Sequence, residues 1–285
     1  YAVERRTNLI KRSGVIFHQN FEVGITQSFE DLQKKHSAIL IATGVYKARD
    51  IKIPGIKLLN VLPALDFLIA SNKKGLGDNV PEFDNGKLNS AKKIVVVVGG
   101  GDTAMDCVRT AVRQGAKSIT CLYRRNRENM PGSMREVSHA EEEGIKFNWL
   151  SVPIKIGGDK IVETIEVAKV KLGKPDATGR NAPQILVNNT SKLKVDMVIK
   201  ALGFDPEPLP KLFNYPLLEV TQWGTIKVDH KTMMTNQAGI FAAGDIVRGA
   251  SLVVWAIKDG RDAADSIDKY LSDNVNEENR KQFIG

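Results

Sequence analysis

A glycine-rich turn in the middle of the chain constrains the fold more than any other feature of the sequence. The β-branched run Ile94–Val98 leads into this turn, and a helix-forming pattern and a second strand-forming run at 118–123 follow it. The turn has the form Gly-x-Gly-x-x-Ala, with Gly99, Gly101 and Ala104 at its defining positions. These small residues permit a tight turn, close approach of the backbone to a pyrophosphate and close packing of the helix on the strand. The sequence therefore predicts an α/β unit with a parallel sheet that binds a dinucleotide at the start of the helix.

The end of the second strand indicates which dinucleotide this unit prefers. NAD-binding units carry an Asp or Glu at this point, which accepts hydrogen bonds from the ribose 2′-hydroxyl. This chain has Arg124 and Arg125 there instead. A guanidinium group matches a 2′-phosphate both by charge and by bidentate geometry, so we expect NADP(H) to be preferred. Arg127 either adds to this positive charge or lies in a solvated loop.

The composition excludes several other classes of protein. The 285 residues include 41 Lys and Arg against 33 Asp and Glu, a net charge of +8, but the basic residues occur as dispersed pairs rather than as a nucleic-acid-binding motif. No run of about 18 apolar residues is present, so we expect no membrane span. Cys107 and Cys121 lack the spacing of a redox pair, and the four histidines lack metal-ligand spacing. We therefore expect a cytoplasmic protein with two core cysteines and no metal, nucleic-acid or membrane partner.

Two further apolar strands end in a small residue and a glycine, one on each side of the central unit. Thr43 and Gly44 follow the first of these strands, and Gly244 and Asp245 follow the second. Their positions predict an outer domain that is interrupted by an inserted inner one. An Asp at the carboxyl end of a strand is placed to hold a polyol, with the helix that starts near Ser251 facing a ring. Plain strand-to-loop turns explain these residues equally well.

Local signals predict three more helices. Ser133 and Glu136 have the Ser-x-x-Glu spacing of a capping box, which predicts a helix that stops at Gly144. Apolar periodicity predicts further helices over 61–71 and 252–271.

Several segments of the chain resemble one family. The chain is similar to the small, or beta, subunit of bacterial NADPH-dependent glutamate synthase over most of its length. The segments that carry the resemblance are 99–109 (GGGDTAMDCVR), 114–125 (QGAKSITCLYRR), 129–133 (NMPGS), 199–206 (IKALGFDP) and 239–264 (GIFAAGDIVRGASLVVWAIKDGRDAA). The resemblance implies an α/β flavoprotein with two Rossmann-like dinucleotide-binding domains, the NADP domain inserted into an incomplete FAD domain. It further implies that NADPH is oxidised at FAD and that electrons pass through iron–sulfur clusters to the large (alpha) subunit, which makes glutamate from glutamine and 2-oxoglutarate.

The resemblance also implies a set of cofactor-binding residues. Gly99, Gly101 and Ala104 are assigned to the NADP pyrophosphate, and Arg124 and Arg125 to its 2′-phosphate. No acid–base side chain is expected, because hydride moves directly from the nicotinamide to the flavin. Trp255 either packs beside the flavin or belongs to the core. The full set of expected cofactor contacts is Thr43, Gly44, Gly99, Gly100, Gly101, Asp102, Thr103, Ala104, Arg124, Arg125, Gly203, Gly244, Asp245, Ser251, Leu252 and Val253.

The resemblance also suggests domain limits. Residues 1–71 and 204–285 are expected to form the two parts of the FAD-binding domain, and 94–203 the NADPH-binding domain. The shift in composition over 72–93 to Asn, Lys, Gly and Asp separately predicts a linker or domain boundary there. The family carries a cysteine-rich iron–sulfur region and a first Gly-x-Gly-x-x-Gly further upstream, so we expect this sequence to be an amino-terminally truncated fragment whose clusters belong to the missing region.

Two other functions fit the same motifs. One is a related two-domain NADPH-dependent flavin subunit that delivers electrons to another acceptor. The other is a non-catalytic NADP-binding module, which would have no need of the outer-domain residues Thr43, Gly44, Gly244 and Asp245.

Overall fold

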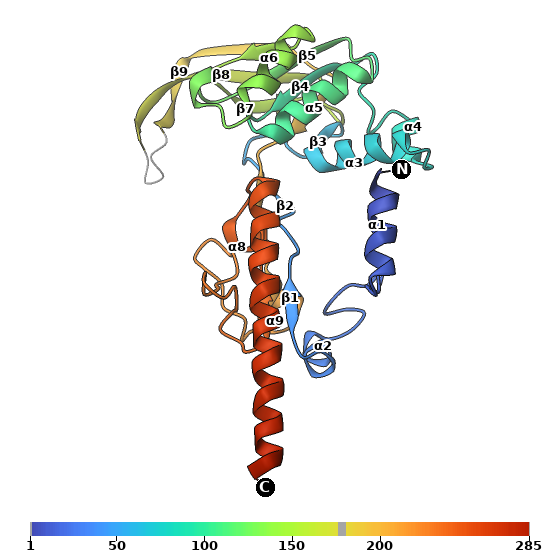
Figure 1. Ribbon diagram of the computed structural model, residues 1–285. Helices are drawn as coiled ribbons and strands as arrows, with labels where there is room; N and C mark the ends of the chain where they lie inside the picture. The colour runs from blue at the N-terminus through green and yellow to red at the C-terminus, as the bar shows by residue number, and fades with distance from the viewer. Residues whose placement is uncertain (1, 176–180, 285) are drawn as a thin grey trace. The chain divides into compact units, whose positions relative to one another are not determined.

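The chain forms two compact units (Figure 1). The computed structural model describes residues 2–175 and 181–284. The outer unit consists of the chain up to Lys47 and from Asp205 onward, and the inner unit runs from Ala48 to Phe204. The inner unit is thus inserted into the outer one, which confirms the predicted α/β fold class. The chain passes between the units at two short strands that pair with each other, β2 (Lys47–Ala48) and β11 (Phe204–Asp205).

The inner unit is built on a five-stranded sheet in which every neighbouring pair is parallel. The predicted strand–turn–helix–strand unit lies at its centre, with Val96 opposite Thr120 in the register. Parallel strands place all their carboxyl ends at one edge, and ligands of such sheets bind at that edge. The strands in spatial order are β3 (Val61–Pro63), β10 (Met197–Lys200), β4 (Ile94–Val98), β5 (Ser118–Leu122) and β6 (Lys146–Asn148).

Both faces of this sheet are covered, which explains the uninterrupted apolar run of β4. Val95 and Val97 belong to a core cluster with the helices, and Val96 and Val98 belong to a second cluster on the opposite face. Successive side chains of a strand point to opposite faces, so a strand buried on both sides is apolar throughout. The helices of the first face are α3 (Ala64–Gly75), α5 (Asp102–Arg113) and α6 (Met134–Glu142), and the strands of the antiparallel sheet on the second face are β7 (Ser151–Gly157), β8 (Thr164–Pro175) and β9 (Asn181–Lys194).

The outer unit contains a parallel pair of strands, β1 and β12. Its core includes Phe29 stacked on Phe213, with 5.1 Å between the ring centroids, and the buried Ile226 and Ile246. The long helix α9 is drawn in red in Figure 1. The elements of this unit are α1 (Ala2–Arg12), α2 (Phe29–Lys35), β1 (Ile39–Ile41), α7 (Leu209–Leu212), β12 (Ile240–Ala242), α8 (Asp245–Arg248) and α9 (Val253–Ile284).

The inner unit begins earlier along the chain than the composition suggested. Val61–Pro63 forms strand β3 rather than the start of a helix, because its backbone pairs with β10. The polar stretch 72–93 contains the end of α3 and the short helix α4 (Pro81–Asp84). Within it, Ser90 is fully buried and its hydroxyl donates to the Gln114 side chain over 2.8 Å. The nucleotide assigned to each unit stays a prediction.

The capping box predicted at the start of α6 does not form. Ser133 is the N-cap residue, but its side chain makes no capping hydrogen bond. The Glu136 carboxylate pairs instead with Arg109 of α5. A tertiary ion pair thus replaces the expected local contact.

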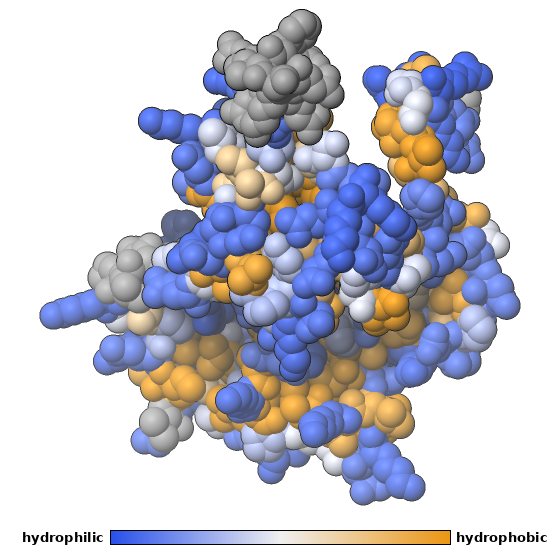
Figure 2. Space-filling view, turned by 90° about the horizontal axis from the view of Figure 1, so that it is seen from below, coloured by the Kyte–Doolittle hydropathy of each residue, from blue (hydrophilic) through white to orange (hydrophobic). Residues whose placement is uncertain are grey.

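Hydrophobic side chains also reach the molecular surface (Figure 2). Leu252, Val253 and Trp255, at the start of α9, are all exposed, and α1 buries none of its residues. Among the described helices, none has the length and apolar character that crossing a membrane requires. In the described ranges, no three His, Cys, Asp or Glu side chains are grouped as metal ligands.

Candidate functional site

A pocket of about 460 Å³ lies in the inner unit, beside the carboxyl ends of β4, β5 and β10. It brings together the glycine turn and the two arginines that the sequence predicted for NADP, together with Gly203, a predicted cofactor contact that was assigned to neither nucleotide. Its lining includes the turn Gly99, Gly100 and Gly101, the arginines Arg124 and Arg125, and Gly203.

Each glycine of the turn has its own steric environment. A Cβ on Gly99, whose φ is +154°, would lie 2.1 Å from the Ala201 carbonyl oxygen. A Cβ on Gly100 would lie 2.3 Å from the ring of Tyr123. A Cβ on Gly101 would have no heavy atom within 4 Å. Gly99 and Gly100 are therefore required by packing, whereas Gly101 leaves open space in which a phosphate can approach the backbone.

The helix that follows the turn fits the predicted dinucleotide unit. Ala104 is completely buried, as close packing of α5 on the sheet requires. Thr103 lines the pocket at the first turn of α5, where unpaired backbone N–H groups attract anions. Asp102 is exposed and is not among the residues that line the pocket, and its Oδ1 accepts a hydrogen bond from the Ser133 N–H at 3.1 Å.

The three arginines after β5 have different surroundings. Arg124 is exposed and lines the pocket. Arg125 lines it too but is only 4% exposed, and its Nε donates to the Asn181 carbonyl oxygen over 2.9 Å. Arg127 pairs with Glu141 of α6 at 2.9 Å. Arg124 is thus the most exposed of the three, the Arg125 Nε is bonded to β9, and Arg127 is paired with α6.

The outer unit brings its two predicted turns together. Strands β1 and β12 are parallel neighbours, and the Ala243 N–H donates to the Ile41 carbonyl oxygen over 3.0 Å. Thr43 and Gly44 follow β1, and Gly244 and Asp245 follow β12, so both turns lie at the same edge. Gly44 and Gly244 have φ values of +69° and +76°, which favour glycine. Their role in binding FAD stays a prediction.

An ion pair that the sequence analysis missed lies beside the Gly244 turn. The Asp259 side chain is 1% exposed and accepts two hydrogen bonds from Arg248, at 2.5 and 2.6 Å. The hydrogen bond from Arg248 lowers the pKa of Asp259, and the Gly244 N–H adds a further bond. Arg248 also lies over the ring of Trp255, 5.1 Å from its centroid, and Trp255 is 45% exposed rather than a core residue. An Arg and an Asp eleven residues apart carry no local signal, because only the docking of α9 brings them together.

Replacing Arg248 with Met should lower the free energy of unfolding by about 2 kcal/mol at pH 7. An ion pair on the surface contributes ~0–1 kcal/mol to stability, whereas breaking a buried ion pair costs ~3–5 kcal/mol. The Arg248–Asp259 pair lies between these cases because the Arg248 side chain is 39% exposed and the Asp259 side chain is 1% exposed. The folded-state pKa of Asp259 is lowered, so the contribution is present above the unfolded-state value of about 3.9 and is lost as the pH falls below it. Urea unfolding at pH 7 and at decreasing pH measures this difference. Lys227→Met, which removes an exposed positive charge, is the matched control. If the difference in unfolding free energy between wild type and Arg248→Met did not shrink at low pH, the assignment would be contradicted.

Both cysteines lie in the core of the inner unit, as predicted. Cys107 of α5 and Cys121 of β5 are fully buried and carry free thiols. Burial raises the pKa of both thiols, to about 12 for Cys121. A thiol becomes a redox nucleophile only as the thiolate, so neither side chain has the properties of a reactive cysteine.

We compared the chain with families of known proteins. Residues 5–260 match the pyridine nucleotide-disulphide oxidoreductase family. The chain belongs to this family. As a member of it, the chain has the family's two-unit fold, and its two cysteines are buried free thiols.

Two curated relatives of this family member have closely similar sequences. The glutamate synthase (NADPH) small chain of Azospirillum brasilense is 60% identical over 268 residues, which are 94% of this chain and 56% of the relative. A putative glutamate synthase (NADPH) small chain of Cereibacter sphaeroides is 54% identical over 270 residues, or 95% of this chain and 65% of the relative. The chain therefore spans between about half and two thirds of the length of these relatives.

A solved structure shows the same fold. FprA of Mycobacterium tuberculosis, as its His57Gln mutant, superposes with a TM-score of 0.74 at 20% identity, covering 90% of this chain and 69% of FprA. At this identity the likeness supports the fold only.

Proposed function

We propose that this chain is the NADPH- and FAD-binding part of a glutamate synthase small subunit. In this function it oxidises NADPH at FAD, and electrons pass through iron–sulfur clusters to the large subunit for the synthesis of glutamate from glutamine and 2-oxoglutarate. The names of the two similar relatives support this proposal. A cytoplasmic location accords with such a role.

The pocket of the inner unit is the observation that carries the proposal. It combines a glycine turn with open space at Gly101, the amino end of α5 and the accessible guanidinium of Arg124. A pyrophosphate fits the first two features, and a 2′-phosphate fits the third. NADP(H) carries both groups.

The outer unit has features that fit FAD. Gly244, Asp245 and the Thr43–Gly44 turn lie at one edge of a parallel strand pair, where a nucleotide's polyol and phosphates bind in related folds. Val253, at the first position of α9, is 71% exposed, and its neighbours Leu252 and Trp255 are exposed as well. Such apolar side chains suit the cover of a flat aromatic ring. FAD would supply the hydride acceptor, while the chain's own residues bind and orient the two nucleotides.

The test is an assay of the native protein with the subunit that copurifies with it. We expect bound flavin, and NADPH oxidation that depends on glutamine and 2-oxoglutarate and yields glutamate. NADH in place of NADPH is the matched control and should be a much poorer donor.

Two results would contradict this function. NADPH oxidation without glutamate formation would indicate a flavin subunit that serves another acceptor. A native protein that binds NADPH but holds no flavin would indicate a binding module without catalysis.

A further inference from the structure

The loop that joins the 3₁₀ turn η1 (Arg127–Asn129) to α6 is bonded directly to the glycine turn. The Gly132 N–H donates to the Gly100 carbonyl oxygen over 3.0 Å. A Cβ on Gly132 would lie 3.2 Å from the same oxygen, so the two backbones are in close contact. Pro131, one residue earlier, lines the pocket together with Gly99, Gly100 and Gly101. The loop 129–133 therefore forms part of the pocket wall beside the turn.

The start of this loop is held by the end of strand β5. The Tyr123 hydroxyl donates to the Asn129 carbonyl oxygen over 2.9 Å. The Tyr123 ring also fills the space next to Gly100. One side chain thus contacts both the glycine turn and the loop across from it.

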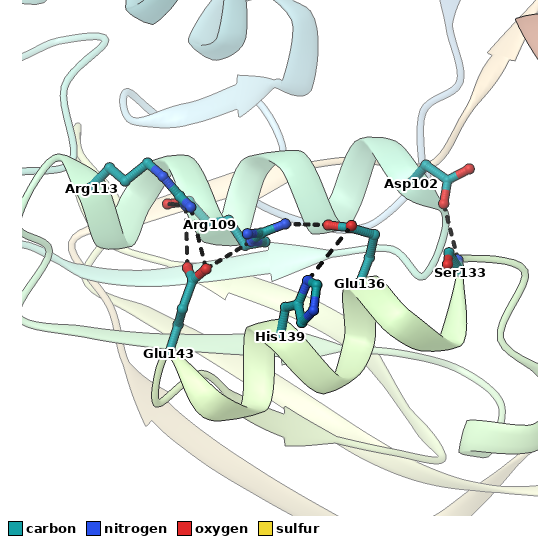
Figure 3. Close-up of polar contacts among 7 residues, drawn as sticks. All are labelled: Asp102, Arg109, Arg113, Ser133, Glu136, His139 and Glu143. Atoms are coloured by element: carbon teal, nitrogen blue, oxygen red, sulfur yellow. Dashed lines mark hydrogen bonds and ion pairs between the residues drawn. The ribbon is translucent and has the colours of Figure 1, made fainter.

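The end of the loop is held by Asp102 (Figure 3). Asp102 is the first residue of α5, and its Oδ1 accepts the hydrogen bond of the Ser133 N–H at 3.1 Å. That N–H belongs to the amino end of α6, where backbone donors have no partner within the helix. In a capping box the Glu136 carboxylate would accept from this N–H, but Glu136 pairs with Arg109, and Asp102 supplies the acceptor from another helix.

A carboxylate at this position opposes the binding of an anion. Asp102 lies at the amino end of α5, the end whose dipole and N–H groups attract phosphate. Its negative charge repels a phosphate bound there. Its hydrogen bond to Ser133, in contrast, holds the loop against the turn. The two properties of this side chain should therefore affect nucleotide binding in opposite directions.

Helix α6 is docked on α5 independently of Asp102. The Arg109 guanidinium bridges Glu136 and Glu143, with 2.9 Å between its Nε and Glu143 Oε1 (Figure 3). Arg113 also pairs with Glu143 at 3.2 Å. Loss of the Asp102 bond should therefore release the loop while the helix stays in place.

We propose that loop 129–133 is a second wall of the nucleotide site and that Asp102 is the positioning residue that holds it there. The inference rests on the proposed function, in that the pocket takes NADP(H). The wall lies next to Gly100 and Gly101, so it restricts the space of the pyrophosphate. Loop 129–133 lies outside the Gly-x-Gly-x-x-Ala motif, so the motif by itself does not predict this wall.

The test compares Asp102→Ala with Asp102→Asn in the full chain. Alanine removes the acceptor and the charge together, so the Kd for NADPH should rise, by at most about the five- to tenfold that one lost hydrogen bond is worth. Asparagine keeps an acceptor and removes the charge, so its Kd should stay within about twofold of wild type or fall. Without nucleotide, hydrogen exchange of the amides of 132–134 should speed up in the alanine variant only. Glu128→Ala, which removes an exposed carboxylate from η1, is the control for charge.

A second variant reaches the same bond from its other end. Ser133→Pro removes the N–H donor, and the φ of −55° at Ser133 accommodates proline. It should weaken NADPH binding as Asp102→Ala does, and combining the two should add little. Equal effects of alanine and asparagine at 102, or faster loop exchange with an unchanged Kd in both Asp102→Ala and Ser133→Pro, would overturn the inference. A wild-type chain that binds no NADPH would instead contradict the proposed function.

Discussion

Replacing Arg124 with alanine should weaken NADPH binding by about 10- to 100-fold and leave NADH binding within about twofold. The accessible guanidinium lines the pocket beyond β5, where a 2′-phosphate would lie, and one charge-assisted hydrogen bond contributes about 1.5–3 kcal/mol. NADH has no 2′-phosphate, so it should be nearly indifferent to the change. Isothermal titration with both nucleotides measures the effect.

A comparison with Arg125 separates an effect on NADPH affinity from an effect on the stability of the fold. Arg125→Ala should also lower the free energy of unfolding, because this side chain is buried and bonded to the Asn181 carbonyl oxygen. Arg124→Ala should leave the unfolding free energy within about 0.5 kcal/mol, as expected for an exposed residue. Equal losses of NADPH and NADH affinity in Arg124→Ala would rule out the 2′-phosphate assignment.

Gly99→Ala should destabilise the inner unit by about 3–5 kcal/mol, a large part of the ~5–15 kcal/mol that holds a domain folded. The added Cβ would lie 2.1 Å from the Ala201 carbonyl oxygen, at a φ of +154° that side chains rarely adopt. The methyl group can be accommodated only if β4 and the chain after β10 move apart, which combines overpacking with backbone strain. Thermal and urea unfolding measure the loss.

Gly101→Ala is the matched control for this effect. Its Cβ would enter open space, and its φ of −95° suits any residue, so the free energy of unfolding should change by less than about 1 kcal/mol. The methyl group would occupy room next to the turn, so NADPH binding should weaken although the fold is intact. A Gly99→Ala protein as stable as Gly101→Ala would contradict the packing described for the turn.

Much of the inner unit was predictable because its signals are local. The apolar run of β4, the glycine turn and α5 are consecutive in the sequence, and the geometry of a βαβ unit follows from their order. The two arginines after β5 were found for the same reason. The burial of Cys107 and Cys121 followed from their positions in a predicted helix and strand.

Other features could not be predicted because they depend on partners far along the chain. Val61–Pro63 is a strand because β10 pairs with it, and β10 comes more than 130 residues later. Glu136 has the spacing of a capping residue, but the Arg109 guanidinium on the neighbouring helix competes successfully for its carboxylate.

The sequence by itself determined the strand, glycine turn and helix of the inner unit and the interruption of one unit by another, because each is encoded in contiguous residues or in their order. The preference for a phosphate-bearing ribose stays a prediction. Only the tertiary structure decided which arginine is most exposed, that Asp102 accepts a hydrogen bond from the Ser133 N–H and that Arg248 is paired with Asp259. The physical reason is that the partner of a charged or polar side chain is set by helix and strand packing. Spacing along the chain carries no information about such neighbours.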